Sequence, residues 1–132
     1  MAKKKTPSIF HYDTNNFNPP APVLEVSLSS PISQEGIIKI LALLDSGADI
    51  TVIPQNIAQQ LHLKYVDEIS ATGYNGITRK VFVYSAKIIF DNFGDFIIRV
   101  ITSNSEHALV GRDILNRLAV FLKGRSKIFE IS

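Results

Sequence analysis

The stretch LALLDSGADITVIP, residues 41–54, constrains the fold of this chain more than any other part of the sequence. It sets a short polar triplet, Asp45-Ser46-Gly47, between two runs of apolar residues. A carboxylate in such a frame loses much of its water, so it needs hydrogen bonds, a partner charge or a bound proton. Ser46 and Gly47 supply a hydroxyl and an unencumbered backbone, and a second acid, Asp49, follows in the same frame. This stretch is therefore the first candidate for a functional site.

Length and composition indicate one globular domain and argue against several classes of partner. The chain has 132 residues, of which 45% are hydrophobic and 20% charged, a normal balance for one domain with its own core. The formal net charge of +2 is too small to favour nucleic acid or a membrane as a partner, and we interpret Lys3-Lys4-Lys5 as a solvated tail. No cysteine is present, and no segment has the roughly 20 apolar residues that span a bilayer. We therefore expect a cytoplasmic protein.

Short strands and turns make up the chain after residue 22. Residues 1–22 are polar and end in a proline-rich run, which predicts an extended leader, and residues 23–132 form the predicted domain. Alternating or β-branched runs between turn residues predict strands at 23–28, 37–44, 68–72, 77–90, 95–102, 108–110, 119–122 and 127–131. Apolar residues at helical spacing predict two short helices, at 55–61 and 112–118. This pattern, which has no βαβ rhythm, indicates an all-β, barrel-like domain.

A second candidate stretch, ALVGRDIL at residues 108–115, contains a strong cation in an otherwise apolar corner. Arg112 is a suitable partner for Asp49, because a guanidinium can hold a carboxylate through two hydrogen bonds. We expect this structural ion pair to fix a loop rather than to take part in chemistry.

Two motifs of this chain resemble those of the retropepsin-like, or retroviral-type, aspartic proteases. The run ALLDSGAD at residues 42–49, followed by Thr51-Val52, looks like the family's active-site signature, and ALVGRDIL is similar to its second signature. Between them, a Gly-tipped hairpin at residues 73–76 occupies the place of the family's flap. The resemblance covers about residues 23–131. The helix at 55–61 and the closing hairpin at 119–131 are more similar to the cellular and bacterial single-domain members.

The resemblance implies an all-β half-barrel that works as a homodimer and cleaves peptide bonds as an aspartic endopeptidase. Each subunit would contribute one Asp45; the pair would share a proton and activate a water. Ser46 would brace the two loops and Gly47 would contact the substrate backbone. An extended polypeptide would lie under the hairpin tips, and no cofactor or metal is implied. The implied substrate-binding residues are Ala48, Asp49, Ile50, Val52, Gly73, Tyr74, Asn75, Gly76 and Leu109.

Other interpretations stay open beside the protease. A retropepsin-like domain without activity could serve as a dimerisation or peptide-binding module, since a fold alone does not give a function. Tyr74 and Asn75 occupy positions where viral members often carry glycine, which bears on how the hairpin closes. The three histidines are scattered without metal-ligand spacing, and the sequence has neither the G-x-S-x-G motif of serine hydrolases nor a Gly-rich phosphate loop. Nucleic-acid binding through residues 3–5 is a third hypothesis.

Overall fold

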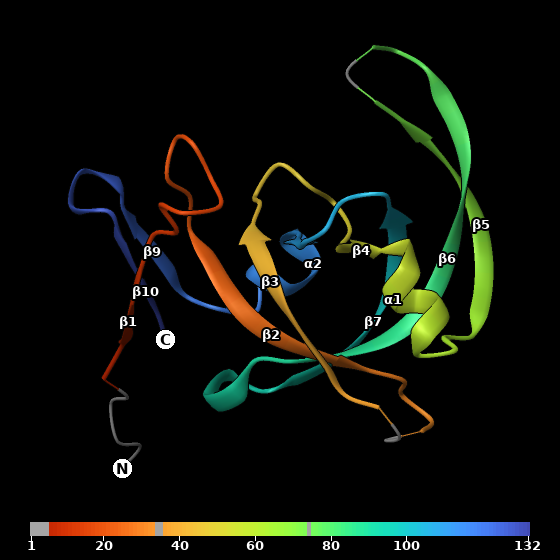
Figure 1. Cartoon of the computed structure of the whole chain (residues 1–132), viewed down its shortest axis with the longest axis horizontal. Coiled ribbons are helices and arrows are strands. Elements are labelled where there is room, and N and C mark those ends of the chain that lie inside the picture. The colour runs from red at the N-terminus through yellow and green to blue at the C-terminus, as the bar shows by residue number, and fades with distance from the viewer. Residues whose placement is uncertain (1–5, 34–35, 74) are drawn as a thin grey trace.

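The computed structural model describes residues 6–33, 36–73 and 75–132, so that Lys3-Lys4-Lys5 of the predicted tail and Tyr74 of the hairpin tip lie outside the described residues. Strands dominate the described part (Figure 1). Along the chain the elements are β1 (Ser8–His11), β2 (Val23–Ser29), β3 (Ile38–Leu44), β4 (Val52–Pro54), α1 (Gln55–Gln60), β5 (Tyr65–Thr72), β6 (Thr78–Ile89), the 3-10 helix η1 (Asp91–Phe93), β7 (Asp95–Ser103), β8 (Ala108–Val110), α2 (Arg112–Leu115), β9 (Val120–Lys123), the 3-10 helix η2 (Gly124–Ser126) and β10 (Ile128–Ile131).

One large sheet contains the strands β2-β3-β8-β4-β7-β6-β5, in that order. β2 also pairs with β6, from Ser27 opposite Ile89 to Ser29 opposite Lys87, and this second pairing curls the sheet into a half-barrel. The inward side chains of these strands form the core together with residues of both α-helices. Its largest fully buried side chains include Phe90, Phe129, Leu28, Ile53, Ile88 and Ile114. This architecture is the all-β half-barrel with short helices that the sequence predicts.

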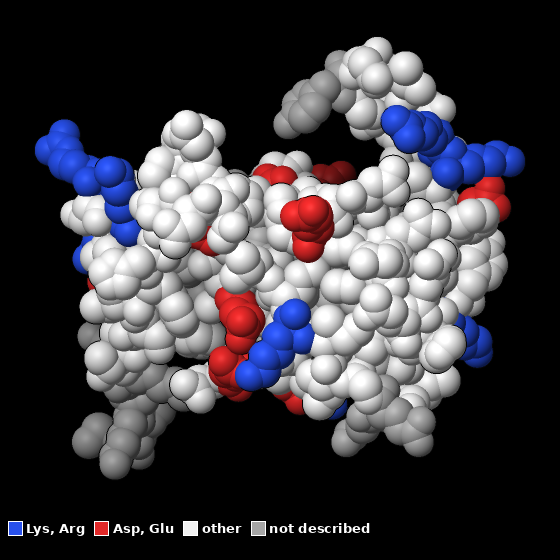
Figure 2. Space-filling view, in the orientation of Figure 1, with Lys and Arg blue, Asp and Glu red and all other residues white. Residues whose placement is uncertain are grey.

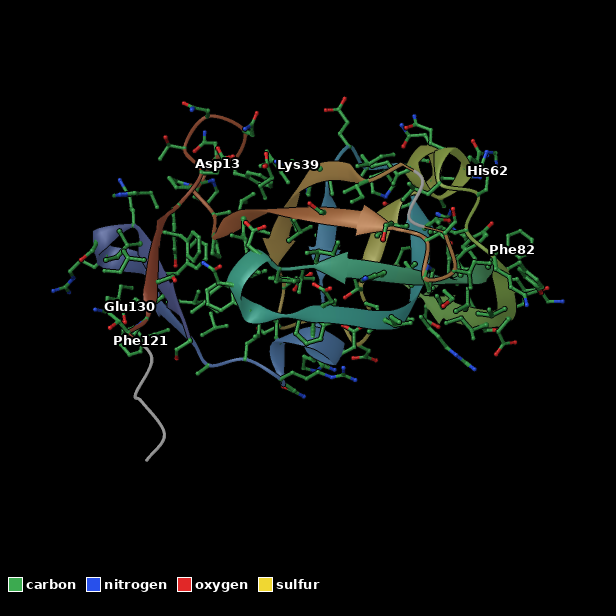
Figure 3. All side chains as sticks on the ribbon, turned by 90° about the horizontal axis from the view of Figure 1, so that it is seen from below. Asp13, Lys39, His62, Phe82, Phe121 and Glu130 are labelled. Atoms are coloured by element: carbon green, nitrogen blue, oxygen red, sulfur yellow. The ribbon has the colours of Figure 1, made fainter. Side chains whose placement is uncertain are left out.

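A small sheet with the order β1-β10-β9 forms one end of the molecule. Figure 3 shows Phe121 and Glu130 at this end, and Phe82 of β6 at the opposite end. β1 lies within the segment 1–22 that composition predicts to be an extended leader, yet it pairs antiparallel with β10. Phe10 stacks on Phe129, with ring centroids 5.2 Å apart. Residues 8–11 therefore differ from the predicted leader, because a strand distant in sequence supplies contacts that their polar surroundings do not reveal.

Most elements lie where the sequence predicts them, and the differences concern short pieces. β4 is not predicted, because a strand of three residues is too short to show alternation; its hydrogen bonds come from β7 and β8. Pro54, the last residue of β4, is the N-cap of α1, with φ −61° and ψ 138°. α2 ends at Leu115, before the predicted end at 118. None of the helices in the described residues has the length and apolar character needed to cross a membrane.

Candidate active site

Strand β3 carries the chain to Asp45 at the edge of the core. Ala42 and Leu44 are buried, whereas Leu43 between them is half-buried on the other face. β3 lies parallel to β8, with Leu44 opposite Val110, and the Asp45 N–H donates to the Val110 carbonyl at 2.9 Å. The chain leaves the sheet at this point and enters the segment that joins β3 to β4, residues 45–51, which we call the Asp45 loop.

The Asp45 carboxylate is half-buried rather than enclosed by the apolar residues that flank it in the sequence. Its Oδ1 accepts a hydrogen bond from the Gly47 N–H at 2.9 Å. A Cβ on residue 47 would lie 3.2 Å from this oxygen, so glycine prevents crowding of the carboxylate. Within the described residues Gly47 is the one hydrogen-bond donor to this carboxylate. The second oxygen, Oδ2, is therefore open to water or to a further polar group.

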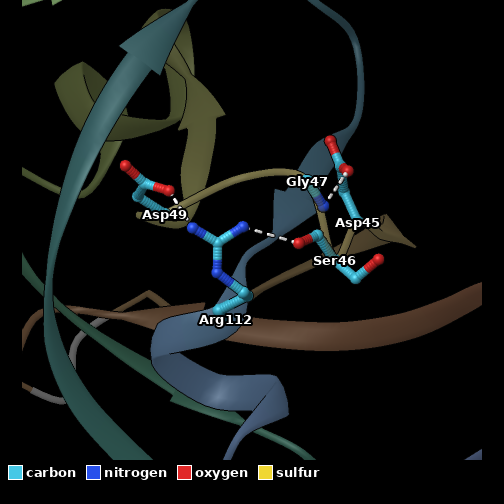
Figure 4. Close-up of polar contacts among 5 residues, drawn as sticks. All are labelled: Asp45, Ser46, Gly47, Asp49 and Arg112. Carbon is cyan, nitrogen blue, oxygen red and sulfur yellow. Dashed lines mark hydrogen bonds and ion pairs between the residues drawn. The ribbon is translucent and has the colours of Figure 1, made fainter.

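Arg112, the first residue of α2, holds the Asp45 loop at three places. Its Nη2 contacts Asp49 Oδ1 and its Nη1 donates to the Ser46 carbonyl at 2.7 Å (Figure 4). Its backbone N–H donates to the Ala48 carbonyl at 2.9 Å. The Asp49 side chain is 85% exposed, so the ion pair alone adds little stability. The guanidinium is more important as a bridge between the two ends of the loop, which it holds at a fixed separation.

Thr51, the last residue of the Asp45 loop, and Asp113 form a second connection between this loop and α2. Thr51 is fully buried; its hydroxyl donates to Asp113 Oδ1 at 2.7 Å, and its N–H donates to Asp113 Oδ2 at 3.0 Å. The same hydroxyl accepts a hydrogen bond from the Gly111 N–H at 3.1 Å. The buried Thr51 hydroxyl is thus paired both as donor and as acceptor, and the part-buried Asp113 carboxylate is held through both of its oxygens.

Gly111 permits this arrangement because the backbone of the Asp45 loop passes very close to it. A Cβ at residue 111 would lie 2.9 Å from both the Ala48 carbonyl oxygen and the Ile50 carbonyl carbon. In the sequence, Gly111 and Asp113 stand out only as members of the ALVGRDIL motif, which assigns neither of them a role. Two signals point to this connection. Thr51 is a polar residue within an apolar run, and Asp113, 62 residues later, is an acid in the first turn of a helix.

An apolar strip crosses the sheet from the end of β3 to β7. Its side chains stand opposite one another in register and are half-buried; they are Leu43, Leu109, Val52 and Ile101. Residues directly opposite each other share one face of a sheet, and the other face, with Ile53 and Val110, is fully buried in the core. The predicted pocket residues Val52 and Leu109 are thus brought together. The other two, Ala48 and Ile50, are half-buried in the Asp45 loop.

β5 and β6 form a long hairpin that rises above the level of the Asp45 loop (Figure 1). At its tip the Gly76 N–H donates to the Gly73 carbonyl at 3.0 Å, and Asn75 Oδ1 accepts from the Ile77 N–H at 3.0 Å. Gly76 has φ +73°, a conformation that glycine adopts without strain. These bonds are local, and the described tip residues form no hydrogen bond with the Asp45 loop of the same chain.

The assembled site contains the accessible carboxylate of Asp45 on a firmly held loop, with an apolar strip beginning beside it, while the exposed carboxylate of Asp49 on the same loop is paired with Arg112. A carboxylate that water can reach can act as a general base when ionised and as a general acid when protonated. Among the described residues there is no group of three or more His, Asp and Glu side chains that could hold a metal ion. The chemistry that the Asp45 carboxylate can support is acid–base chemistry.

The profile of the retroviral aspartyl protease family matches residues 19–123 of this chain. No curated protein sequence matches it. A retropepsin-like aspartic protease from Rickettsia conorii has a similar structure over 99% of this chain and 96% of its own, with a TM-score of 0.63 and 16% sequence identity. The simian foamy virus protease is similar over 72% of this chain and 92% of its own, with a TM-score of 0.54 and 19% identity. At such identities the two structures show a common fold, whereas the profile matches most of the sequence. The chain therefore belongs to the retroviral aspartyl protease family.

Proposed function

We propose that this protein is an aspartic endopeptidase in which two subunits each contribute one Asp45. The observation that carries the proposal is the Asp45 carboxylate itself: it is accessible, it keeps Oδ2 free of other described donors, and it lies at the start of the apolar strip. Membership of the family and the half-barrel fold support peptidase chemistry. Ser46 and Gly47 complete the triplet on which the family resemblance is based.

Two such carboxylates meeting across a two-fold axis would share one proton. Like charges about 3 Å apart cannot both ionise, so the two titration steps of the pair separate. The ionised carboxylate takes a proton from a water held between the two, while the protonated one polarises the carbonyl of the bond to be cut. The water then attacks the carbonyl carbon directly.

The mechanism needs two such carboxylates, but the sequence contains a single Asp-Ser-Gly triplet. Two copies of the chain are therefore needed for one site. The small sheet supports such an assembly. β9 is its last strand, and the outer edge of β9 has no strand partner within the described residues. Phe121 and Leu122 on this strand are 58% and 55% exposed. A free, apolar edge can pair with its own copy across a two-fold axis, which gives the self-complementary contact that a homodimer needs.

The substrate would be an extended polypeptide lying between the apolar strip and the β5–β6 hairpin, which would serve as a flap. Ala48, Ile50, Val52 and Leu109 would contact its side chains, and the loop around Asp49 its main chain. The described tip residues Gly73, Asn75 and Gly76 would close over it and exclude water. Peptides bound in this way gain affinity from main-chain hydrogen bonds and selectivity from alternating pockets.

Cleavage of a mixed peptide library between about pH 4 and 7 tests the proposal, because the reaction needs one ionised and one protonated carboxylate in the same pair. Wild-type protein should cut a subset of peptides, and Asp45→Asn should cut none while keeping the same circular dichroism spectrum and sedimentation coefficient. If wild-type protein is dimeric by sedimentation and still cuts nothing, the domain is a dimerisation or peptide-binding module instead.

A further inference from the structure

The face of the large sheet that carries the apolar strip continues onto the β5–β6 hairpin. Ile101 on β7 stands opposite Val83 on β6, and every second residue of a strand points to the same side. Val81 and Arg79, two and four residues before Val83, are therefore on the face that begins at Asp45. Arg79 in turn stands opposite Ala71 on β5, near the tip of the hairpin.

This inner face of the hairpin borders an open hollow of about 450 Å³. Ala71, Ile77 and Val81 supply apolar walls, Asn75 supplies an amide, and Arg79 is the one charged residue among those that line it. Figure 2 shows Lys and Arg side chains on the hairpin with an acidic side chain beside them, and both acidic and basic side chains on the body below it. A single guanidinium among neutral residues can select a substrate by its charge. A bound chain would displace the water around the guanidinium, and its attraction for a negative side chain would become stronger.

Arg79 also differs from its neighbours in having no ion pair with any described residue. Lys80, on the outer face, lies 3.7 Å from Glu68, and Arg99 at the base of the hairpin lies 3.8 Å from Asp67. Asp49, in the loop below, is already engaged by Arg112. The guanidinium of Arg79 is exposed and its five donors are available to a planar acceptor, for which a carboxylate is the best match.

From these observations we infer that Arg79 is a specificity-determining residue that selects polypeptides with an acidic side chain close to the cleaved bond. The inference rests on the proposed function, since it assigns a substrate class to the same site. When the hairpin closes, an Asp or Glu side chain of the substrate pairs with Arg79 inside the hollow. A substrate glutamine in place of the glutamate fills the same space but lacks the negative charge that pairs with Arg79.

Peptide pairs that differ only as Glu against Gln test this inference, with one pair for each position around a bond that the wild-type dimer cuts. At one position the Glu peptide should have the higher kcat/KM by about tenfold, which corresponds to about 1.4 kcal/mol. Arg79→Gln should bring this ratio close to one, and Arg79→Glu should make a Lys peptide the better substrate at the same position. Lys80→Gln removes the neighbouring cation on the outer face and should leave the ratio unchanged.

Three results would overturn the inference, and they differ in what they mean for the site. Equal cleavage of Glu and Gln peptides at every position removes the selective role of Arg79 and leaves the protease intact. An equal loss for all peptides in Arg79→Gln, with a shifted pH profile, means that Arg79 acts on the Asp45 pair and not on substrate. No cleavage of any peptide by the wild-type dimer contradicts the proposed function itself, and this inference with it.

Discussion

The Asp45 loop joins two strands of the large sheet and the β5–β6 hairpin forms its last two strands, but different kinds of contact hold them in place. The loop is bound to residues 62 to 66 positions further along the chain, through the Thr51–Asp113 hydrogen bonds and through Arg112. The tip of the hairpin is held by a bond between Asn75 and Ile77, two positions apart, and β5 is exposed along nearly its whole length. Contacts between distant segments break only when the fold opens, whereas local ones can break alone.

This difference matches what each region would have to do in the proposed enzyme. A carboxylate that activates water must stay in one place, because small displacements of a reacting group reduce the rate strongly. A cover over the substrate must open and close, so it should have a low cost of local unfolding. The predictions below test this comparison with matched substitutions, from the largest expected effect to the smallest.

Gly111→Ala should have the largest effect on stability. The new Cβ would lie 2.9 Å from backbone atoms of residues 48 and 50, which cannot move without displacing the Asp45 loop. We expect a loss of about 3 kcal/mol in the free energy of unfolding, measured by urea denaturation, since overpacking of a tight contact costs this much. Gly124→Ala is the control, because its nearest contact, the Tyr12 hydroxyl, is 3.8 Å away. Similar small losses for both variants would show that the loop is not tightly anchored.

Thr51→Val and Thr72→Val make the same change in the two regions. In Thr51→Val, Asp113 and the Gly111 N–H lose a buried partner, so we expect a loss of about 2 kcal/mol. Thr72 shares only an exposed hydroxyl contact of 3.0 Å with Thr78 on the hairpin, and its substitution should change the stability by less than about 0.5 kcal/mol. Equal losses in the two variants would mean that the hairpin is as firmly anchored as the loop.

The same contrast between local and distant contacts explains which features could be predicted from the sequence. Strands such as β2, β3 and β7 follow from the alternation of nearby residues, and Asp45 and Arg112 were found because their motifs are compact. β4, the pairing of β1 with β10, and the Thr51–Asp113 connection depend on segments that meet only in the folded chain. The position of Arg79 on the inner face of the hairpin likewise depends on a register of four strand pairings, from β3 through β8, β4 and β7 to β6, and no local pattern shows it.

Arg112→Lys should lower the free energy of unfolding by less than Gly111→Ala or Thr51→Val. A lysine carries a charge but cannot bridge the Ser46 carbonyl and the Asp49 carboxylate with one planar group, so we expect a loss of about 1 kcal/mol. Arg99→Lys is the matched change beside the hairpin. It affects one exposed ion pair, with Asp67 at 3.8 Å, and should lower the free energy of unfolding by only about 0.2 kcal/mol. Denaturation midpoints at constant m measure both, and a reversed order would contradict the bridging role of Arg112.

Gly76→Ala should have the smallest effect on global stability and a clear effect on local opening. Its φ of +73° costs an alanine about 1 kcal/mol, but the hydrogen bonds of the described tip residues all stay within the hairpin. The strain can therefore be relieved by opening the tip, and the free energy of global unfolding should change by less than about 0.5 kcal/mol. Hydrogen exchange should become faster for amides near the ends of β5 and β6, and should stay unchanged for the Asp45 and Thr51 amides. If the variant instead loses about 1 kcal/mol or more of global stability, the hairpin opens only together with the whole domain. A cover that cannot open on its own would fail as the flap of the proposed enzyme, because substrate could not enter beneath it.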